Sequence, residues 1–141
     1  MKIIKLLGVL IIMSILFSSC GGFSEQTQGS SETDAATKQN YVNITPEEAK
    51  AVMDNESGYI ILDVRTEEEF AEGHIPGAIL IPDYEISAKA ESVLSDKNQT
   101  ILVYCRSGRR SKLAAQALLE LGYTDIREFG GIIDWKYETE K

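Results

Sequence analysis

From residue 41 onward, short uniformly apolar runs alternate with stretches that carry apolar residues at helical spacing. Uniformly apolar runs are typical of strands buried on both faces of a parallel sheet, and amphipathic stretches are typical of helices that cover such a sheet. We therefore predict an α/β fold with an open parallel sheet flanked by helices. The predicted strands are residues 59–64, 78–81, 100–104 and 125–129, and the predicted helices are residues 46–54, 67–72, 84–94 and 111–121, with a terminal helix from about residue 132.

Capping signals accompany several of these helices. Thr45 lies three residues before Glu48, and Thr66 stands in the same relation to Glu69. This spacing lets the threonine hydroxyl and the glutamate carboxylate satisfy two backbone N–H groups at a helix start. Gly122 follows the longest amphipathic stretch, where a residue with left-handed backbone commonly ends a helix. These signals set helix boundaries that periodicity alone leaves open.

The first forty residues have a different pattern. Lys2 and Lys5 precede the apolar run 6–17, which is shorter than the roughly 20 residues that a membrane-spanning helix needs. Small residues then lead directly to Cys20. This order resembles a bacterial lipoprotein signal, with Phe17 at a position where leucine is usual. The alternatives are an ordinary secretory signal or an uncleaved anchor helix, and each of them would also export the domain.

The lipoprotein resemblance implies a division of the chain into three parts. Residues 1–19 would be the signal peptide, and Cys20 would carry the lipid that attaches the protein to the membrane. Residues 20–41 would form a flexible tether, because residues 21–40 contain one aromatic residue and no branched aliphatic residue. Residues 42–141 would form the single folded domain. We expect the mature protein at the extracytoplasmic face of the cell membrane or in the periplasm.

Composition and charge narrow the function classes. The chain has 141 residues and a net charge of −8, which fits one acidic globular domain and argues against nucleic-acid binding. Three of its arginines nevertheless lie between residues 106 and 110. A local positive site in an acidic chain predicts a small anionic ligand. With two cysteines and one histidine, His74, the sequence has too few soft ligands for a zinc site, and we expect no metal and no cofactor.

Cys105 stands where an apolar strand ends and a helix is about to begin. Gly108 allows the intervening chain to curl, so that backbone N–H groups and the helix dipole can converge on one point. Together with the adjacent arginines, these groups would lower the thiol pKa from its ordinary value of about 8.5. The alternative is that Cys105 is a small apolar residue that closes a buried strand. The loop after Cys105 is Arg106, Ser107, Gly108, Arg109 and Arg110.

Three segments resemble the rhodanese-like family in the same order and spacing. The first is Leu62-Asp63-Val64-Arg65-Thr66-Glu67-Glu68-Glu69-Phe70 with Gly73-His74-Ile75-Pro76-Gly77-Ala78, the second is Tyr104-Cys105-Arg106-Ser107-Gly108-Arg109-Arg110-Ser111, and the third is Phe129-Gly130-Gly131-Ile132-Ile133-Asp134-Trp135. The resemblance covers almost all of the predicted domain. It implies a rhodanese fold with its active loop at the carboxyl end of a central strand.

The resemblance also implies a sulfurtransferase in which Cys105 is the catalytic residue. The Cys105 thiolate would take a sulfur atom from thiosulfate or a persulfide donor, and would pass it to a thiol or to cyanide. The backbone of residues 106–110 would hold the persulfide, and the three arginines would attract the anionic donor. Arg110 fills the terminal position of the loop, whereas Arg109 could equally face solvent.

Four further residues of these segments have structural interpretations. Asp63 and Arg65 are charged residues at the end of a buried strand, which is costly unless they pair, so we interpret them as support for neighbouring loops. The family resemblance places His74 in a structural turn. Trp135 is interpreted as a core residue.

Two other function classes are compatible with the same architecture. Dual-specificity phosphatases and arsenate reductases have a cysteine loop that is longer by one residue, whereas four residues separate Cys105 from Arg110. The shorter loop favours a single sulfur atom over a tetrahedral oxyanion. A noncatalytic module that binds a partner or senses sulfur compounds is the second alternative, although Cys105, Gly108 and Arg110 are all present.

The lipid-anchor prediction is tested by Cys20→Ala. Because the lipid is attached through the cysteine sulfur, the variant should lose both signal cleavage and membrane retention, measured by fractionation and by the mass of the mature chain. Retention and processing that survive the change would contradict the lipoprotein interpretation.

Overall fold

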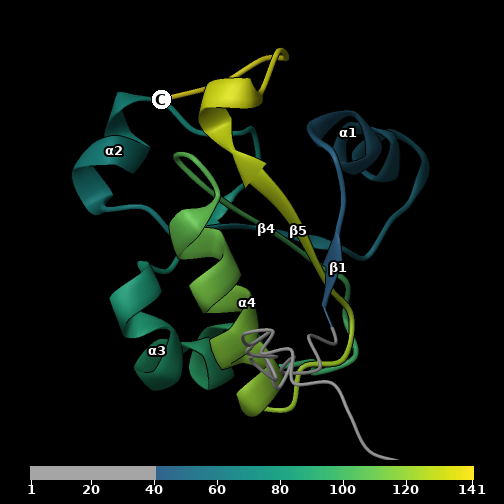
Figure 1. Cartoon of the computed structure of the whole chain (residues 1–141), viewed down its shortest axis with the longest axis vertical. Helices are drawn as coiled ribbons and strands as arrows, with labels where there is room; N and C mark the ends of the chain where they lie inside the picture. Colours follow the sequence, from purple (N-terminus) through teal and green to yellow (C-terminus); the bar gives the residue numbers. More distant parts are fainter. Residues whose placement is uncertain (1–40) are drawn as a thin grey trace, which may run out of the picture. The chain divides into compact units, whose positions relative to one another are not determined.

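A computed structural model describes residues 41–141 (Figure 1). The predictions made for residues 1–40, including the signal peptide, lipidated Cys20 and the tether, lie outside the described residues. No helix between Tyr41 and Lys141 combines the length and the apolar character that crossing a membrane requires.

The described chain folds around a parallel sheet of five strands in the order β1-β5-β4-β2-β3. The strands are β1 (Val42–Asn43), β2 (Ile60–Asp63), β3 (Ile79–Leu80), β4 (Ile101–Cys105) and β5 (Ile126–Gly131). The helices are α1 (Pro46–Asn55), α2 (Glu67–Glu72), α3 (Ile86–Val93) and α4 (Arg109–Glu120), with 3-10 turns η1 (Asp83–Glu85) and η2 (Ile132–Asp134). The predicted α/β class and the parallel sheet are confirmed.

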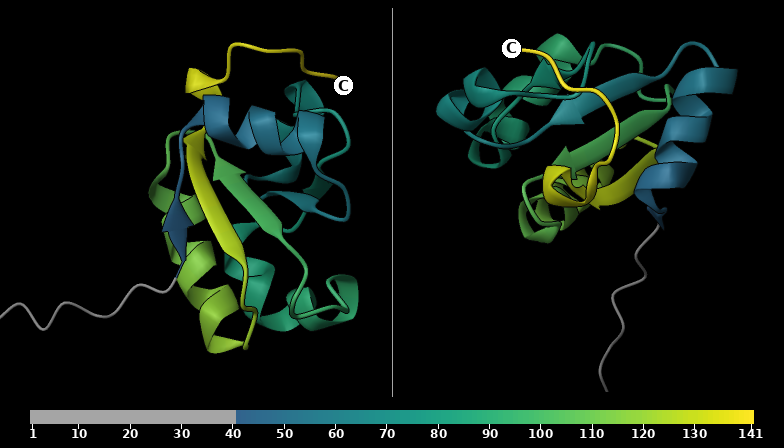
Figure 2. Two further views of the ribbon diagram at one scale, coloured as in Figure 1. Left: turned by 90° about the vertical axis from the view of Figure 1, so that its right-hand side faces the viewer. Right: turned by 90° about the horizontal axis from the view of Figure 1, so that it is seen from above.

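Helices cover both faces of the sheet, and β4 shows why. Along this strand Ile101, Val103 and Cys105 pack into a cluster with α3 and α4, whereas Leu102 and Tyr104 pack into a second cluster with α1. Successive side chains of a strand point to opposite faces, so a central strand with apolar residues at every position needs cover on both sides. Accordingly, α1 lies across the sheet from α3 and α4 (Figures 1 and 2).

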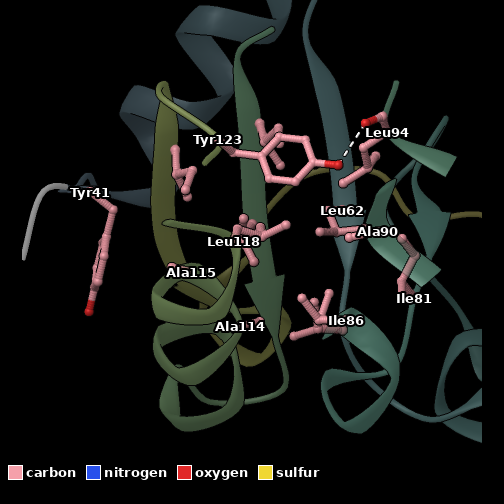
Figure 3. Packing of buried hydrophobic residues seen from close by; sticks show 14 of the residues in the cluster. Tyr41, Leu62, Ile81, Ile86, Ala90, Leu94, Ala114, Ala115, Leu118 and Tyr123 are labelled. Carbon is pink, nitrogen blue, oxygen red and sulfur yellow. Dashed lines mark hydrogen bonds between the residues drawn. The ribbon is translucent and has the colours of Figure 1, made fainter. Parts of the chain in front are cut away.

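A buried tyrosine links the C-terminal ends of α4 and α3 (Figure 3). Tyr123 follows α4 and is 1% exposed, and its hydroxyl donates a hydrogen bond to the carbonyl of Leu94 at 2.6 Å. The hydroxyl thus provides a hydrogen-bond donor for a carbonyl at the C-terminal end of α3, while the ring packs in the cluster. Tyr41, which the sequence analysis put at the last position of the tether, is also buried in this cluster.

Both predicted capping boxes are present. The Thr45 hydroxyl accepts a hydrogen bond from the Glu48 N–H, and the Glu48 carboxylate accepts one from the Thr45 N–H. Thr66 and Glu69 make the same reciprocal pair at the start of α2.

Several boundaries differ from the predicted ones. Helix α4 begins at Arg109 rather than at residue 111, because Gly108 adopts a left-handed φ of 96° and turns the chain directly into the helix. The predicted terminal helix is the single 3-10 turn η2. Strand β1 was not predicted; its two residues alone carry no usable periodicity, and its pairing with β5 is a tertiary contact.

Candidate active site

Cys105 is the last residue of β4 and is 1% exposed. The loop that follows it curls back through Gly108, whose N–H donates a hydrogen bond to the Cys105 Sγ at 3.0 Å. This geometry requires the left-handed backbone of Gly108, which side chains disfavour. The sulfur therefore lies at the base of a short loop, with a backbone N–H directed at it.

The pKa of the Cys105 thiol results from opposing effects. Burial raises it, because a buried charge is poorly solvated. Hydrogen bonds from the Ser111 hydroxyl and from the backbone N–H groups of Ser111, Ser107 and Gly108 lower it, and these outweigh the burial. The net pKa lies below the ordinary value, so this environment favours the thiolate.

A second loop packs against the cysteine loop and fixes its path. A Cβ atom added at Gly131 would lie 2.1 Å from the Arg106 carbonyl oxygen, so only glycine fits between the two backbones. The Ile133 N–H donates a hydrogen bond to the same Arg106 oxygen at 3.3 Å. The backbone of the Phe129-Gly130-Gly131 segment thus shapes the path of the cysteine loop.

The three arginines of the loop have different environments. Arg110 forms a bidentate ion pair with Glu69, with Nη1 to Oε2 at 2.7 Å and Nη2 to Oε1 at 2.8 Å. Arg106 and Arg109 are exposed, and neither makes an ion pair with any residue of the described chain. The charge of Arg110 is therefore offset by a carboxylate, whereas those of Arg106 and Arg109 remain available to an anion from solvent.

Glu69 is a site residue that the sequence analysis did not single out. It was interpreted only as the capping residue of α2, and its carboxylate makes that contact as well as the pair with Arg110. Helix α2 is thereby tied to the first turn of α4. The partner lies 41 residues further along the chain, which no local pattern reveals.

Asp63 and Arg65 form the buried pair that their positions predict. Nε and Nη2 of Arg65 donate to the Asp63 carboxylate at 2.6–3.0 Å, and Nη2 also donates to the Gly73 carbonyl at 2.8 Å. Beside them, the Tyr104 hydroxyl accepts a hydrogen bond from the Ile75 N–H at 3.1 Å. These contacts attach the 73–77 turn to the ends of β2 and β4. Asp63 and Arg65 therefore support the neighbouring turn.

His74 and Trp135 also occupy structural positions. The His74 ring stacks on Phe70 with centroids 3.7 Å apart, and its backbone pairs with Glu140 near the C-terminus. Trp135 packs 5.8 Å from Phe129 and lines a groove of about 560 Å³ beside α1. No residue of the cysteine loop lines that groove.

The chain also matches a known protein family. Residues 45–138 match the model described as "Rhodanese-like domain". The chain belongs to the rhodanese-like family.

Relatives of this rhodanese-like domain carry informative names. The thiosulfate sulfurtransferase PspE of Escherichia coli is 41% identical over 73 residues, which is 52% of this chain and 70% of PspE. Two further relatives are longer than this chain. The match spans 52% of the length of the putative sulfur carrier protein YrkF of Bacillus subtilis, and 24% of the length of the adenylyltransferase and sulfurtransferase UBA4 of Candida albicans. Several relatives are named sulfurtransferases, which supports sulfurtransferase activity for this chain.

Solved structures show the same fold. A structure titled "rhodanese with anions from E. coli" has 37% sequence identity and a TM-score of 0.56, and the alignment covers 59% of this chain and 98% of that one. A rhodanese-like domain protein from Staphylococcus aureus has 34% identity and a TM-score of 0.59, with coverage of 70% and 96%. The predicted rhodanese fold is confirmed.

The ion pair between Glu69 and Arg110 should make the stability of the domain depend on pH. Hydrogen bonds from Arg110 lower the pKa of Glu69 from 4.5 to about 2. The pair therefore stabilises the fold fully above about pH 4.5, and this contribution is lost as the pH falls towards 2. In thermal unfolding at neutral pH, Glu69→Gln should be less stable than the unmodified chain by about 1 kcal/mol.

The difference in stability between the two proteins should shrink as the pH falls through the same range. Glu72→Gln is the matched control, because it removes an exposed carboxylate from the same helix. A difference between Glu69→Gln and the unmodified chain that stays constant from neutral pH to pH 2 would show that the pair contributes no charge-dependent stability.

Proposed function

We propose that this protein is a sulfurtransferase that carries sulfur as a persulfide on Cys105, with thiosulfate or a persulfide as donor and a thiol or cyanide as acceptor. The observation that carries the proposal is the hydrogen bond of the Gly108 N–H to the Cys105 Sγ at 3.0 Å, at the base of a loop whose other donors also lower the thiol pKa. Such a loop suits a sulfur that is negatively charged both before and after it accepts a second sulfur atom.

The first step forms the persulfide. The Cys105 thiolate attacks the outer sulfur of thiosulfate, a new sulfur–sulfur bond forms, and the sulfur–sulfur bond of the donor breaks with its electron pair leaving on sulfite. The terminal sulfur of the persulfide is anionic, so backbone N–H groups of the loop stabilise it. No acid is needed to protonate the leaving sulfite, which is a stable anion.

The second step returns the enzyme to its starting state. An acceptor thiolate or cyanide attacks the terminal sulfur, and the bond between the two sulfur atoms breaks with its electron pair returning to Cys105. The product is a persulfide or thiocyanate. Since Cys105 leaves as a thiolate, the same interactions that lower its pKa also favour this step.

The exposed arginines suit the recognition of an anionic donor. The whole chain carries a net charge of −8, so its general field repels anions. Arg106 and Arg109 belong to the loop after Cys105 and are exposed, whereas Arg110 forms an ion pair with Glu69. We assign donor attraction chiefly to Arg106 and Arg109, and we assign to Arg110 the role of anchoring the loop.

We also propose that the domain works at the extracytoplasmic face of the cell membrane or in the periplasm, attached through a lipid on Cys20. Support comes only from the order of basic, apolar and small residues before that cysteine. In this arrangement Cys105 would be the one free thiol of the mature chain.

Mass spectrometry after incubation with thiosulfate tests the persulfide directly. In a full chain that carries Cys20→Ala, Cys105 is the sole cysteine, and it should gain the mass of one sulfur atom. Cyanide should remove that sulfur as thiocyanate, and Cys105→Ser should gain none, because it lacks the nucleophile. The absence of an adduct with thiosulfate and with persulfide donors would overturn the sulfurtransferase proposal and favour a noncatalytic module.

Arginine variants test the recognition of the donor. Arg106→Ala and Arg109→Ala should each raise KM for thiosulfate roughly two- to fivefold, the effect of losing an exposed charge, and the increase should shrink at high salt. Steady-state kinetics at several salt concentrations provide the measurement. Lys50→Ala is the control, since it removes a positive charge from α1 on the opposite face of the sheet. Unchanged KM in both arginine variants would refute their role.

A further inference from the structure

Arg110 is the one arginine of the cysteine loop whose side chain is partly buried. It is 19% exposed, whereas Arg106 and Arg109 are exposed. It lies in the first turn of α4, and the residue that caps this helix is Gly108, whose N–H donates to the Cys105 Sγ at 3.0 Å. The fold therefore fixes one guanidinium next to the reacting loop, and the partners of this guanidinium determine how the loop meets an anion.

Glu69 neutralises this guanidinium. Both Nη atoms of Arg110 donate to the two carboxylate oxygens of Glu69, at 2.7 and 2.8 Å. The Thr66 N–H also donates to the Glu69 Oε2, at 3.1 Å, so the carboxylate is fixed by its own helix as well as by its partner. Hydrogen bonds from Arg110 lower the pKa of Glu69 to about 2, so the carboxylate is ionised at neutral pH. The pair therefore carries no net charge.

A second carboxylate lies near the same guanidinium. The turn η1 carries Asp83 and packs against α4. The pKa of Arg110 is raised first by its hydrogen bonds to Glu69, and burial opposes that shift. The charges of Cys105 and Asp83 raise it further, because both groups lie near the guanidinium. Two carboxylates and one guanidinium leave a formal charge of −1 beside the cysteine loop.

This charge distribution affects the possible sulfur donors unequally. Thiosulfate carries two negative charges, whereas a persulfide of a small thiol carries one on its sulfur, or none when it is protonated. Coulomb energy scales with the charge of the donor, so the carboxylates beside Arg110 oppose thiosulfate about twice as strongly as a singly charged persulfide. Arg106 and Arg109 attract both donors, but they do so from exposed positions where water and salt weaken the attraction.

We propose that Glu69 is a positioning residue that sets donor specificity: by neutralising Arg110, it favours persulfide donors over thiosulfate and other doubly charged oxyanions. The inference rests on the proposed function and narrows its donor. The Cys105 thiolate attacks the terminal sulfur of the donor persulfide, and a new sulfur–sulfur bond forms. The sulfur–sulfur bond of the donor breaks, and its electron pair leaves on the donor thiolate. Glu69 acts on this step through Arg110.

Steady-state kinetics of Glu69→Gln with two donors test the proposal, in the full chain with Cys20→Ala and with cyanide as the acceptor. Glutamine removes the charge but still suits the capping box with Thr66. The variant should raise kcat/KM about tenfold for thiosulfate and only about threefold for cysteine persulfide, because the effect scales with donor charge. Glu72→Gln, which removes an exposed carboxylate from the same helix, should leave the ratio of the two kcat/KM values unchanged.

A charge cycle separates specificity from the anchoring of the loop. Arg110→Gln leaves the Glu69 carboxylate without its partner, so it should lower kcat/KM for thiosulfate more than for cysteine persulfide. The double variant Glu69→Gln with Arg110→Gln removes both charges and should return the ratio of the two kcat/KM values towards that of the unmodified chain. Loss of anchoring alone would lower both values alike, and the second substitution would not reverse it.

Inhibition by sulfate provides a measurement that involves no sulfur transfer from the anion. Sulfate carries two negative charges, as thiosulfate does, but it has no sulfur that Cys105 can take. It should inhibit the reaction with cysteine persulfide about tenfold more strongly in Glu69→Gln than in the unmodified chain. Thermal unfolding of each variant shows that it is folded at the assay temperature.

The outcomes distinguish this inference from the proposed function. If Cys105 forms a persulfide but the donor ratio is the same in Glu69→Gln and the unmodified chain, sulfur transfer stands and the role of Glu69 in specificity is overturned. An unmodified chain that uses thiosulfate more efficiently than cysteine persulfide would overturn the donor preference as well. The absence of a persulfide with both donors would overturn sulfur transfer itself.

Discussion

The convergence of hydrogen-bond donors on one buried sulfur is the interaction on which the rest of the site depends. Cys105 is 1% exposed, and burial alone would keep its thiol protonated. The Gly108 N–H at 3.0 Å and the donors from Ser107 and Ser111 reverse that preference. They can do so only if the loop keeps this backbone conformation, and much of the surrounding structure stabilises it.

Three sets of contacts hold the loop from different directions. Below it, the Gly131 backbone fits against the Arg106 carbonyl, where a side chain would collide. Glu69 forms a bidentate ion pair with Arg110, which connects α2 to α4. Behind it, the buried pair of Asp63 and Arg65 fastens the 73–77 turn to the end of β2. The contacts of Gly131 with Arg106 and of Glu69 with Arg110 join segments distant in sequence, so the site depends on how the elements at this edge of the sheet pack together.

The distribution of charge separates anchoring from recognition. A net charge of −8 disfavours anions over most of the surface, and the loop after Cys105 concentrates positive charge at one place. Within that loop, Arg110 is neutralised by its partner, and Arg106 and Arg109 are exposed. Beneath it, Glu128 adds a buried carboxylate that accepts a hydrogen bond from the Ser111 hydroxyl.

Periodicity and residues that are neighbours in the chain were enough to predict the α/β class, both capping boxes, the central strand that ends at Cys105 and the loop that follows it. The position of Asp63 and Arg65 at the end of a buried strand likewise predicted a pair. Other features of the site depend on contacts between elements. The partner of Arg110, the fit of Gly131 and the contact between Ser111 and Glu128 join residues from different elements. Their distances depend on how the strands pair and the helices pack, and a one-dimensional pattern contains no such information.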